Sequence, residues 1–176
     1  WKPGYQDRAE NAYLYSNALA SAQAYRTAGD TAKADEMEAF AQNIKTQVMK
    51  VLWNPDTKLL EHAMASDGEH VPWKEINNYY PFTVGLVPKP GDSDYDDDYV
   101  EALRLFADDE QYPIFPFYTA NQADQAAYAA TGGQGSNNFS VINSTVMFRM
   151  LSTVLREYPT DAIDAEWYKK LLYWNA

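Results

Sequence analysis

The sequence contains no cysteine. Without thiols the chain cannot form disulfides, cysteine-ligated zinc sites or iron–sulfur clusters, and it has no thiol nucleophile. It also lacks an apolar run near the ~18 to 20 residues that crossing a bilayer requires, so we expect no membrane partner. Basic residues are scarce, because 14 Lys and Arg stand against 25 Asp and Glu. The resulting net charge of -11 repels a phosphate backbone, and we expect no nucleic-acid partner.

Several motifs of catalysis and cofactor binding are missing too. The sequence has no Gly-x-Ser-x-Gly elbow, no Gly-x-x-x-x-Gly-Lys phosphate loop and no His-x-x-x-His pair that could seat a metal on one helix face. His62 and His70 lie in a loop region beside Glu61 and Glu69, and we interpret both as ordinary loop histidines. We therefore expect neither a cofactor nor a resident metal.

Aromatic residues, in contrast, are abundant. They make up 15% of the chain, with 14 Tyr and 5 Trp, which is more than core packing needs. Because Tyr and Trp offer a flat apolar face with a polar handle, such a surplus often lines a sugar site. The chain begins at Trp1 and ends in an apolar run, 171–174, with no helix stop after it. We expect it to be a piece of a longer protein.

Hydrophobic spacing predicts an all-α chain. One helical hairpin is predicted over 7–28 and 31–53, with Gly29 ending the first helix, and a second over 139–158 and 160–174. Shorter helices are predicted near Pro81, over 97–106, and from a Thr119 cap to about Ala130, and a short extended piece over 58–64. The predicted core-facing positions are Met37, Phe40, Ala41, Ile44, Val48, Val51 and Leu52 in the first hairpin and Met147, Met150, Leu151, Val154, Leu155, Tyr158, Ile163, Trp167, Leu171 and Trp174 in the second.

Three polar segments, 73–82, 115–122 and 136–140, interleave amides or carboxylates with aromatic rings. Sugar hydroxyls need paired donors and acceptors, and the apolar face of a sugar stacks on rings. These segments therefore favour a sugar-binding cleft, although core packing and helix capping also explain their composition. The predicted substrate-binding residues are Trp73, Tyr79, Tyr80, Tyr118, Asn121, Gln122, Asn138 and Asn143.

Two groups of acids have alternative interpretations. The run from Asp92 to Asp98 has the acid spacing of a calcium loop, but Asp97 stands at the glycine position and Leu103 at the closing-glutamate position, so a solvated helix start is favoured over a calcium site. Asp7 and Glu10 are three residues apart. They suit a helix capping box, and the functional alternative is that one of them faces the cleft.

The order of motifs along the chain resembles the (α/α)6-toroid glycoside hydrolases of the trehalase, family 63 and mannosylglycerate-hydrolase-like group. The motifs that carry the resemblance are 5–15, Ala28-Gly29-Asp30, Leu52-Trp53-Asn54, Trp73-Lys74-Glu75, Tyr80-Pro81-Phe82, Gly85-Leu86-Val87-Pro88, Thr119-Ala120-Asn121-Gln122 and 137–151. The resemblance implies that residues 1–176 are a fragment of one catalytic domain, with helical hairpins forming about half of a toroid. It implies an uncovered helical face that the rest of the parent protein or another copy would cover.

The resemblance also implies hydrolysis of glycosidic bonds in an oligosaccharide or glycan, with inversion by an acid and base carboxylate pair. In the trehalase-like members the acid precedes the Asn-Ala-Tyr-Leu-Tyr-like helix and the base follows the region where this chain ends. Asp7 and Glu75 are therefore the catalytic candidates within this chain, Glu75 chiefly for orienting substrate, and the fragment alone should be inactive. Such enzymes often act on external glycans, which favours a secreted or cell-surface location. The alternative function is a non-catalytic helical module that binds glycan or a protein partner.

Overall fold

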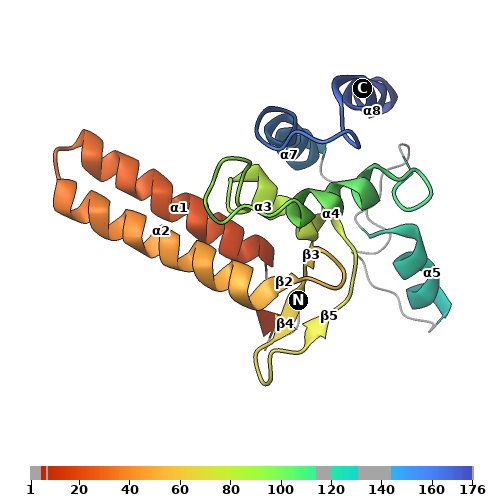
Figure 1. Cartoon of the computed structure of the whole chain (residues 1–176), viewed down its shortest axis with the longest axis horizontal. Helices are drawn as coiled ribbons and strands as arrows, with labels where there is room; N and C mark the ends of the chain where they lie inside the picture. Colours follow the sequence, from red (N-terminus) through yellow and green to blue (C-terminus); the bar gives the residue numbers. More distant parts are fainter. Residues whose placement is uncertain (1–4, 7, 114–119, 131–143, 176) are drawn as a thin grey trace.

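A computed structural model describes residues 5–6, 8–113, 120–130 and 144–175. Its longest elements are α1 (Arg8–Thr27) and α2 (Thr31–Leu52), which pack side by side and extend away from the rest of the molecule (Figure 1). Gly29 joins them with a φ of +85°. Asp30 caps α2 by accepting a hydrogen bond from the Lys33 amide at 3.1 Å. The first predicted hairpin is thus confirmed.

Short strands lie at the inner end of this hairpin (Figure 1). β1 (Tyr5–Gln6), β4 (His62–Met64) and β5 (His70–Val71) form a three-stranded antiparallel sheet in the order β1-β4-β5. β2 (Trp53–Asn54) pairs with β3 (Leu59–Leu60). In register, His62 faces Val71 and Ala63 faces His70. The predicted extended piece over 58–64 therefore contains β3 and β4.

The remaining elements are short helices followed by two longer ones. The turn η1 (Ile76–Asn78) leads into α3 (Tyr80–Thr83), and α4 (Asp98–Ala107), α5 (Gln122–Ala130), α7 (Ser144–Glu157) and α8 (Ala165–Asn175) follow. α7 and α8 pack against each other, where Ser152 Oγ lies 3.2 Å from Tyr168 Oη. Helices and helical hairpins dominate, so the predicted all-α class is confirmed. No helix among the described residues combines the length and apolar character needed to cross a membrane.

The core lies where α3, α4 and α7 meet the inner end of the hairpin. Met147, Met150, Leu151 and Val154 on α7 are all fully buried. The Phe82 ring of α3 lies 5.0 Å from the Tyr158 ring, centroid to centroid. Most predicted core positions are therefore confirmed, because helical spacing places them on one face of each helix.

Some sequence predictions need correction. Phe40 is 43% exposed and Trp174 is 55% exposed, although both keep the spacing of their buried stripes. The last helix begins at Ala165 rather than 160, because Asp164 provides the cap through its contact with the Trp167 amide at 2.7 Å. Asn121 caps α5 by accepting from the Asp124 amide at 2.9 Å, and the predicted cap Thr119 lies outside the described residues.

Candidate functional site

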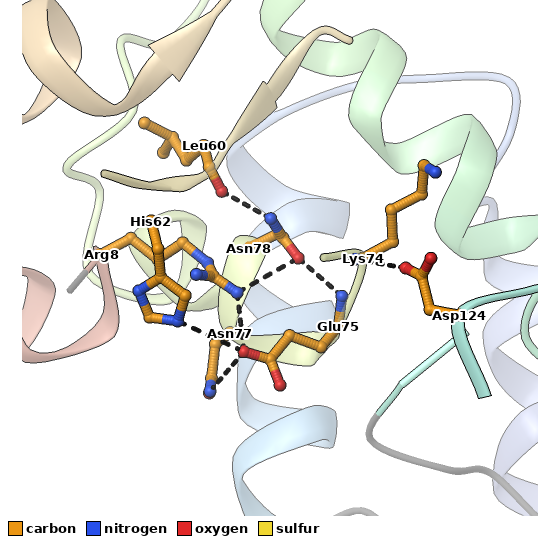
Figure 2. Close-up of polar contacts among 8 residues, drawn as sticks. All are labelled: Arg8, Leu60, His62, Lys74, Glu75, Asn77, Asn78 and Asp124. Carbon is orange, nitrogen blue, oxygen red and sulfur yellow. Dashed lines mark hydrogen bonds and ion pairs between the residues drawn. The ribbon is translucent and has the colours of Figure 1, made fainter. Parts of the chain in front are cut away.

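The first residue of α1 is a fully buried arginine. Arg8 Nη2 donates to Glu75 Oε1 at 2.8 Å and to Asn78 Oδ1 at 3.4 Å (Figure 2). A guanidinium removed from water is stable only when carboxylates and other acceptors replace its hydration. This contact therefore fixes the start of α1 against the segment that enters η1.

The Asn78 side chain holds that segment in shape. Its Oδ1 accepts from the Glu75 backbone amide at 2.7 Å, and its Nδ2 donates to the Leu60 carbonyl at 2.6 Å. Asn78 is itself 1% exposed, so these hydrogen bonds are shielded from water. Asn78 thus links the Glu75 backbone to β3, independently of the contacts that the Glu75 carboxylate makes.

Three donors surround one oxygen of the Glu75 carboxylate. Besides Arg8, Asn77 Nδ2 donates to Oε1 at 3.2 Å and His62 Nε2 lies 3.6 Å away. The other oxygen, Oε2, points away from these three groups (Figure 2). The Glu75 side chain is 15% exposed. The protein therefore holds one oxygen, and the other faces away from the three donors.

The surroundings lower the pKa of Glu75. Burial alone would raise it, but the hydrogen bond from His62, the positive charge of Arg8 and the Asn77 amide together outweigh burial. The carboxyl group is consequently ionised at neutral pH. It can accept hydrogen bonds or a proton, but it has no proton of its own to donate.

The Tyr80 ring lies near this carboxylate, and a second ring lies against Tyr80. The ring centroids of Tyr13 on α1 and Tyr80 on α3 are 6.3 Å apart. Burial raises the pKa of Tyr80 to about 12, and the nearby Tyr13 and the negative charge of Glu75 add to that increase. The Tyr80 phenol therefore stays protonated and can donate. The ionised Glu75 carboxylate thus has an amide, Asn77, and a phenol, Tyr80, near it, and the Tyr13 ring lies against Tyr80.

The second predicted polar segment joins the same neighbourhood through its backbone. Glu75 forms a β-bridge with Ala120, and the Asn121 amide donates to the Lys74 carbonyl at 3.0 Å. The Lys74 amide donates to Asp124 Oδ2 at 2.6 Å (Figure 2). The predicted polar segments 73–82 and 115–122 therefore lie side by side where Lys74 and Glu75 meet Ala120 and Asn121.

The predicted binding residues have different surroundings. Trp73 is 39% exposed and Tyr80 is half-buried, so both can contact a ligand. Tyr79 is fully buried, with its ring centroid 4.8 Å from that of Phe106. The structure places Tyr79 in the core because its ring fills the space between η1 and α4.

The two amides predicted on the next segment support the backbone. Asn121 is also fully buried. Its Oδ1 caps α5 and its Nδ2 donates to Gln111 Oε1 at 3.3 Å. The Gln122 amide donates to the Gln111 carbonyl at 2.9 Å. Four predicted site residues, Asp7, Tyr118, Asn138 and Asn143, lie outside the described residues.

Sequence reasoning missed Arg8, Tyr13 and His62. The available signal for Arg8 was its spacing, because it precedes the buried Ala12 by four residues and therefore lies on the buried face of α1. Tyr13 stood inside a motif of the family resemblance but was not selected.

The interpretation of the two histidines as ordinary loop residues is wrong. Both histidines lie on short strands, β4 and β5, and each lies near a carboxylate. His62 contacts Glu75, and His70 Nδ1 lies 3.2 Å from Glu61 Oε2. Glu61 is 1% exposed and also accepts from Asn54 Nδ2 at 2.8 Å. Helical spacing cannot reveal either contact, because His70 reaches Glu61 through the pairing of β4 with β5 and His62 reaches Glu75 through the packing of β4 near η1.

The acidic segment before α4 contacts lysines. Lys45 Nζ lies 3.6 Å from carboxylate oxygens of both Asp92 and Asp94, and Lys58 Nζ lies 2.6 Å from Asp98 Oδ1. In the part of the chain that the structure describes, no three His, Asp or Glu side chains are grouped to hold a metal ion.

Residues 5–97, more than half of the chain, match the family model of the mannosylglycerate hydrolase MGH1-like glycoside hydrolase domain. The chain belongs to this family. The matched part of the MGH1-like domain includes Arg8, His62, Glu75, Asn77 and Tyr80. The resemblance inferred from the sequence is thus confirmed, and the chain is part of a carbohydrate-active enzyme domain.

The MGH1-like chain also resembles a solved structure named sialidase. The two superpose with a TM-score of 0.79 at 20% sequence identity, over 96% of this chain and 15% of that one. At this identity the likeness concerns the fold. The chain spans about one seventh of that protein's length, so the activity of the larger protein is not carried over.

Proposed function

We propose that this chain is part of the catalytic domain of a glycoside hydrolase. We further propose that the Glu75 cluster contacts one sugar unit of an oligosaccharide or glycan. This cluster consists of Glu75 with Arg8, His62, Asn77 and Tyr80. The observation that carries the proposal is the ionised Glu75 carboxylate, which Arg8 and Asn77 hold through Oε1 near the Tyr80 phenol. Membership of the MGH1-like family supplies the reaction class.

This set of groups suits a sugar. Glu75 Oε2 can accept from a sugar hydroxyl, and the Tyr80 phenol can donate to another. The Tyr13 ring, 49% exposed, and the Trp73 ring, 39% exposed, can stack on the apolar face of the sugar. Directional acceptors beside flat apolar surfaces recognise a sugar better than they recognise a purely apolar ligand.

The charge of Glu75 limits its part in the reaction. An inverting glycosidase needs one protonated acid and one ionised base, about 6.5 to 9.5 Å apart. Glu75 has a lowered pKa and can serve only as the base or as an orienting acceptor. The acid then comes from another residue. Asp7 remains the candidate within this chain, because it directly precedes Arg8.

The competing proposal is a non-catalytic helical module that binds glycan or a protein partner. The observation that favours it is an apolar surface on α8, where Leu172 is 39%, Tyr173 79% and Trp174 55% exposed. Surfaces of this kind often mark contacts between proteins. In the enzyme proposal the rest of the parent protein, or another copy of the chain, covers this surface.

The deciding experiment uses the intact protein that contains this chain. Oligosaccharides and aryl glycosides are offered as substrates, and NMR follows the anomer that is released. Turnover with inversion is expected, and Glu75→Gln should lower kcat/KM by about 100-fold or more if Glu75 is the base. A loss confined to KM would instead assign Glu75 to substrate orientation.

The matched control is Glu166→Gln, which removes an exposed carboxylate on α8 and should leave turnover unchanged. Retention of anomeric configuration would contradict the inverting mechanism. Absence of turnover across the panel, with glycan binding retained in calorimetry, would favour the module.

Binding by the cluster is tested through Trp73. Trp73→Ala removes a partly exposed ring and should weaken glycan binding by about tenfold while the melting temperature changes little. Calorimetry and thermal unfolding of the intact protein give both readouts. Unchanged affinity would count against stacking at this position.

A further inference from the structure

A polar pocket of about 510 Å³ lies between the turn after α3 and one face of α7. These elements pack against each other near the centre of the molecule (Figure 1). Thr83, Gly85 and Lys89 line one side, and Arg149, Ser152 and Arg156 line the other. Gly85 ends α3 with a φ of +69°, and this turn carries the chain toward Lys89. None of these residues belongs to the Glu75 cluster.

The pocket carries an excess of positive charge. Three cationic side chains line it, and Glu157 is the one acid among its lining residues. Glu157 Oε2 is already engaged, because Lys89 Nζ donates to it at 2.5 Å. The two arginines are therefore left without a carboxylate inside the pocket, in a chain whose net charge is -11.

The arginines of the pocket differ from the others in the chain. Arg8, Arg26 and Arg104 each lie within 3.2 Å of at least one carboxylate oxygen. Among the described residues, Arg149 and Arg156 contact no carboxylate within 4 Å. Both residues are exposed, so their guanidinium groups are open to an anion that enters from solvent.

We propose that this pocket binds a small molecule bearing an oxyanion group, namely a carboxylate, sulfate or phosphate. The planar guanidinium forms two parallel hydrogen bonds with such a group, which makes arginine the preferred residue for binding it. Arg149 and Arg156 are seven residues apart on one helix, which is about 10 Å along its axis, and Ser152 lies between them. The volume lies in the range typical of small-molecule sites.

A hydroxyl on the pocket wall adds to this argument. Thr83 Oγ1 is buried and has no hydrogen-bond partner among the described residues. A buried hydroxyl without a partner costs free energy, and rotation toward an oxyanion would satisfy it. The Ser152 hydroxyl, in contrast, already lies 3.2 Å from the Tyr168 hydroxyl.

The test measures oxyanion binding to the intact protein by calorimetry at low ionic strength. Glucuronate, inorganic sulfate and inorganic phosphate are the probes, and glucose is the neutral reference. At least one oxyanion should bind with a dissociation constant of about 1 mM or below, and more weakly in high salt. Binding of glucuronate alone would identify a sugar acid as the ligand, and binding of the inorganic ions would show that charge alone is recognised.

The variants assign that binding to the pocket. The double substitution Arg149→Gln with Arg156→Gln should weaken it by about tenfold or more, because two charge-assisted hydrogen bonds are lost. The matched control, Lys169→Gln with Lys170→Gln on α8, removes the same charge outside the pocket and should change affinity less than about twofold. Equal binding by the two double variants, or absence of binding by the wild type, overturns the proposal. Glu75→Gln should leave oxyanion binding unchanged, which separates this site from the proposed sugar site.

Discussion

At the scale of single residues, the buried charge of Arg8 is central. Alanines occupy all the other buried positions of α1, so Arg8 places a cation on a face that is otherwise apolar. It remains there because Glu75 and Asn78 replace the water it has lost. Arg8 therefore links the stability of the fold to the geometry of the candidate site, because Arg8 and Glu75 hold each other in position.

Arg8→Met should therefore cost about 3 kcal/mol of stability, because it leaves the partly buried Glu75 carboxylate with less compensation. Urea unfolding of the intact protein measures the loss. Arg104→Met is the control, since Arg104 pairs with Glu101 and Asp161 at the surface and its removal should change stability little. Equal losses of stability in the two variants would show that the buried ion pair of Arg8 contributes no more than a surface ion pair.

The lowered pKa of Glu75 predicts how stability depends on pH. The ionised form is favoured in the folded state, so its contribution is complete above the ordinary pKa of glutamate, about 4.3, and is lost as the pH falls through the lower folded pKa. The difference in unfolding free energy between wild type and Glu75→Gln should be constant near neutral pH and shrink below about pH 4.3. A difference that does not change with pH would contradict the assigned charge.

The sequence revealed part of this site. The family resemblance pointed to Glu75, and the alternation of polar groups with rings pointed to Tyr80. Their partners lie on another helix and on a strand. Arg8 and His62 could not be assigned, because their pairing depends on how α1 and β4 pack against η1. Composition indicates which groups are available, and tertiary contacts decide which of them meet.

At the scale of elements, the turn between α1 and α2 depends on one backbone conformation. Gly29 adopts a φ of +85°, and an added Cβ would meet no atom within 4 Å. Substitution there is therefore opposed by backbone strain rather than by steric contact.

Gly29→Ala should cost about 1 kcal/mol, and Gly29→Asn should cost less, because asparagine tolerates the left-handed region better. Thermal unfolding of both variants is the measurement. The opposite ranking would mean that a contact, and not backbone conformation, limits this turn.

Element boundaries were predicted best where local chemistry decides them. Gly29 and Asp30 fixed the first hairpin, since a left-handed residue and a helix cap act within a few residues. The last helix was placed too early because Thr160 and Asp164 both suit a cap, and the structure uses Asp164. Phe40 has the helical spacing of the buried residues but is exposed. Spacing identifies one face of a helix, but it does not show how far along the helix that face is covered by the rest of the protein.

At the scale of the whole molecule, α7 joins the parts of the core. Its buried face meets α3, and Met150 is fully enclosed. Met150→Asp should unfold the chain or lower its melting temperature severely, because a carboxylate buried without a partner is costly. Met150→Leu conserves volume and should cost less than about 1.5 kcal/mol. Circular dichroism during heating distinguishes the two, and an unchanged melting temperature in Met150→Asp would show that the core is misplaced.

The exposed rings of α8 also concern the molecule as a whole. That the chain forms about half of a toroid stays a prediction, and it accounts for Tyr173 and Trp174 lying in solvent on a helix whose Leu171 is fully buried. A helix with apolar residues on two faces is suited to lie between two layers. Covering this surface would require a further segment or a second copy.

The hairpin between β4 and β5 also has a practical use. Its tip at Ser66 is exposed, and hydrogen bonds from the Gly68 amide to the Met64 carbonyl and from the Glu69 amide to Asp67 keep it ordered. Because the chain contains no cysteine, Ser66→Cys would supply its single thiol. An environment-sensitive dye attached there would lie on the hairpin that carries His62, and a change in its fluorescence on adding glycan would test the proposed sugar site.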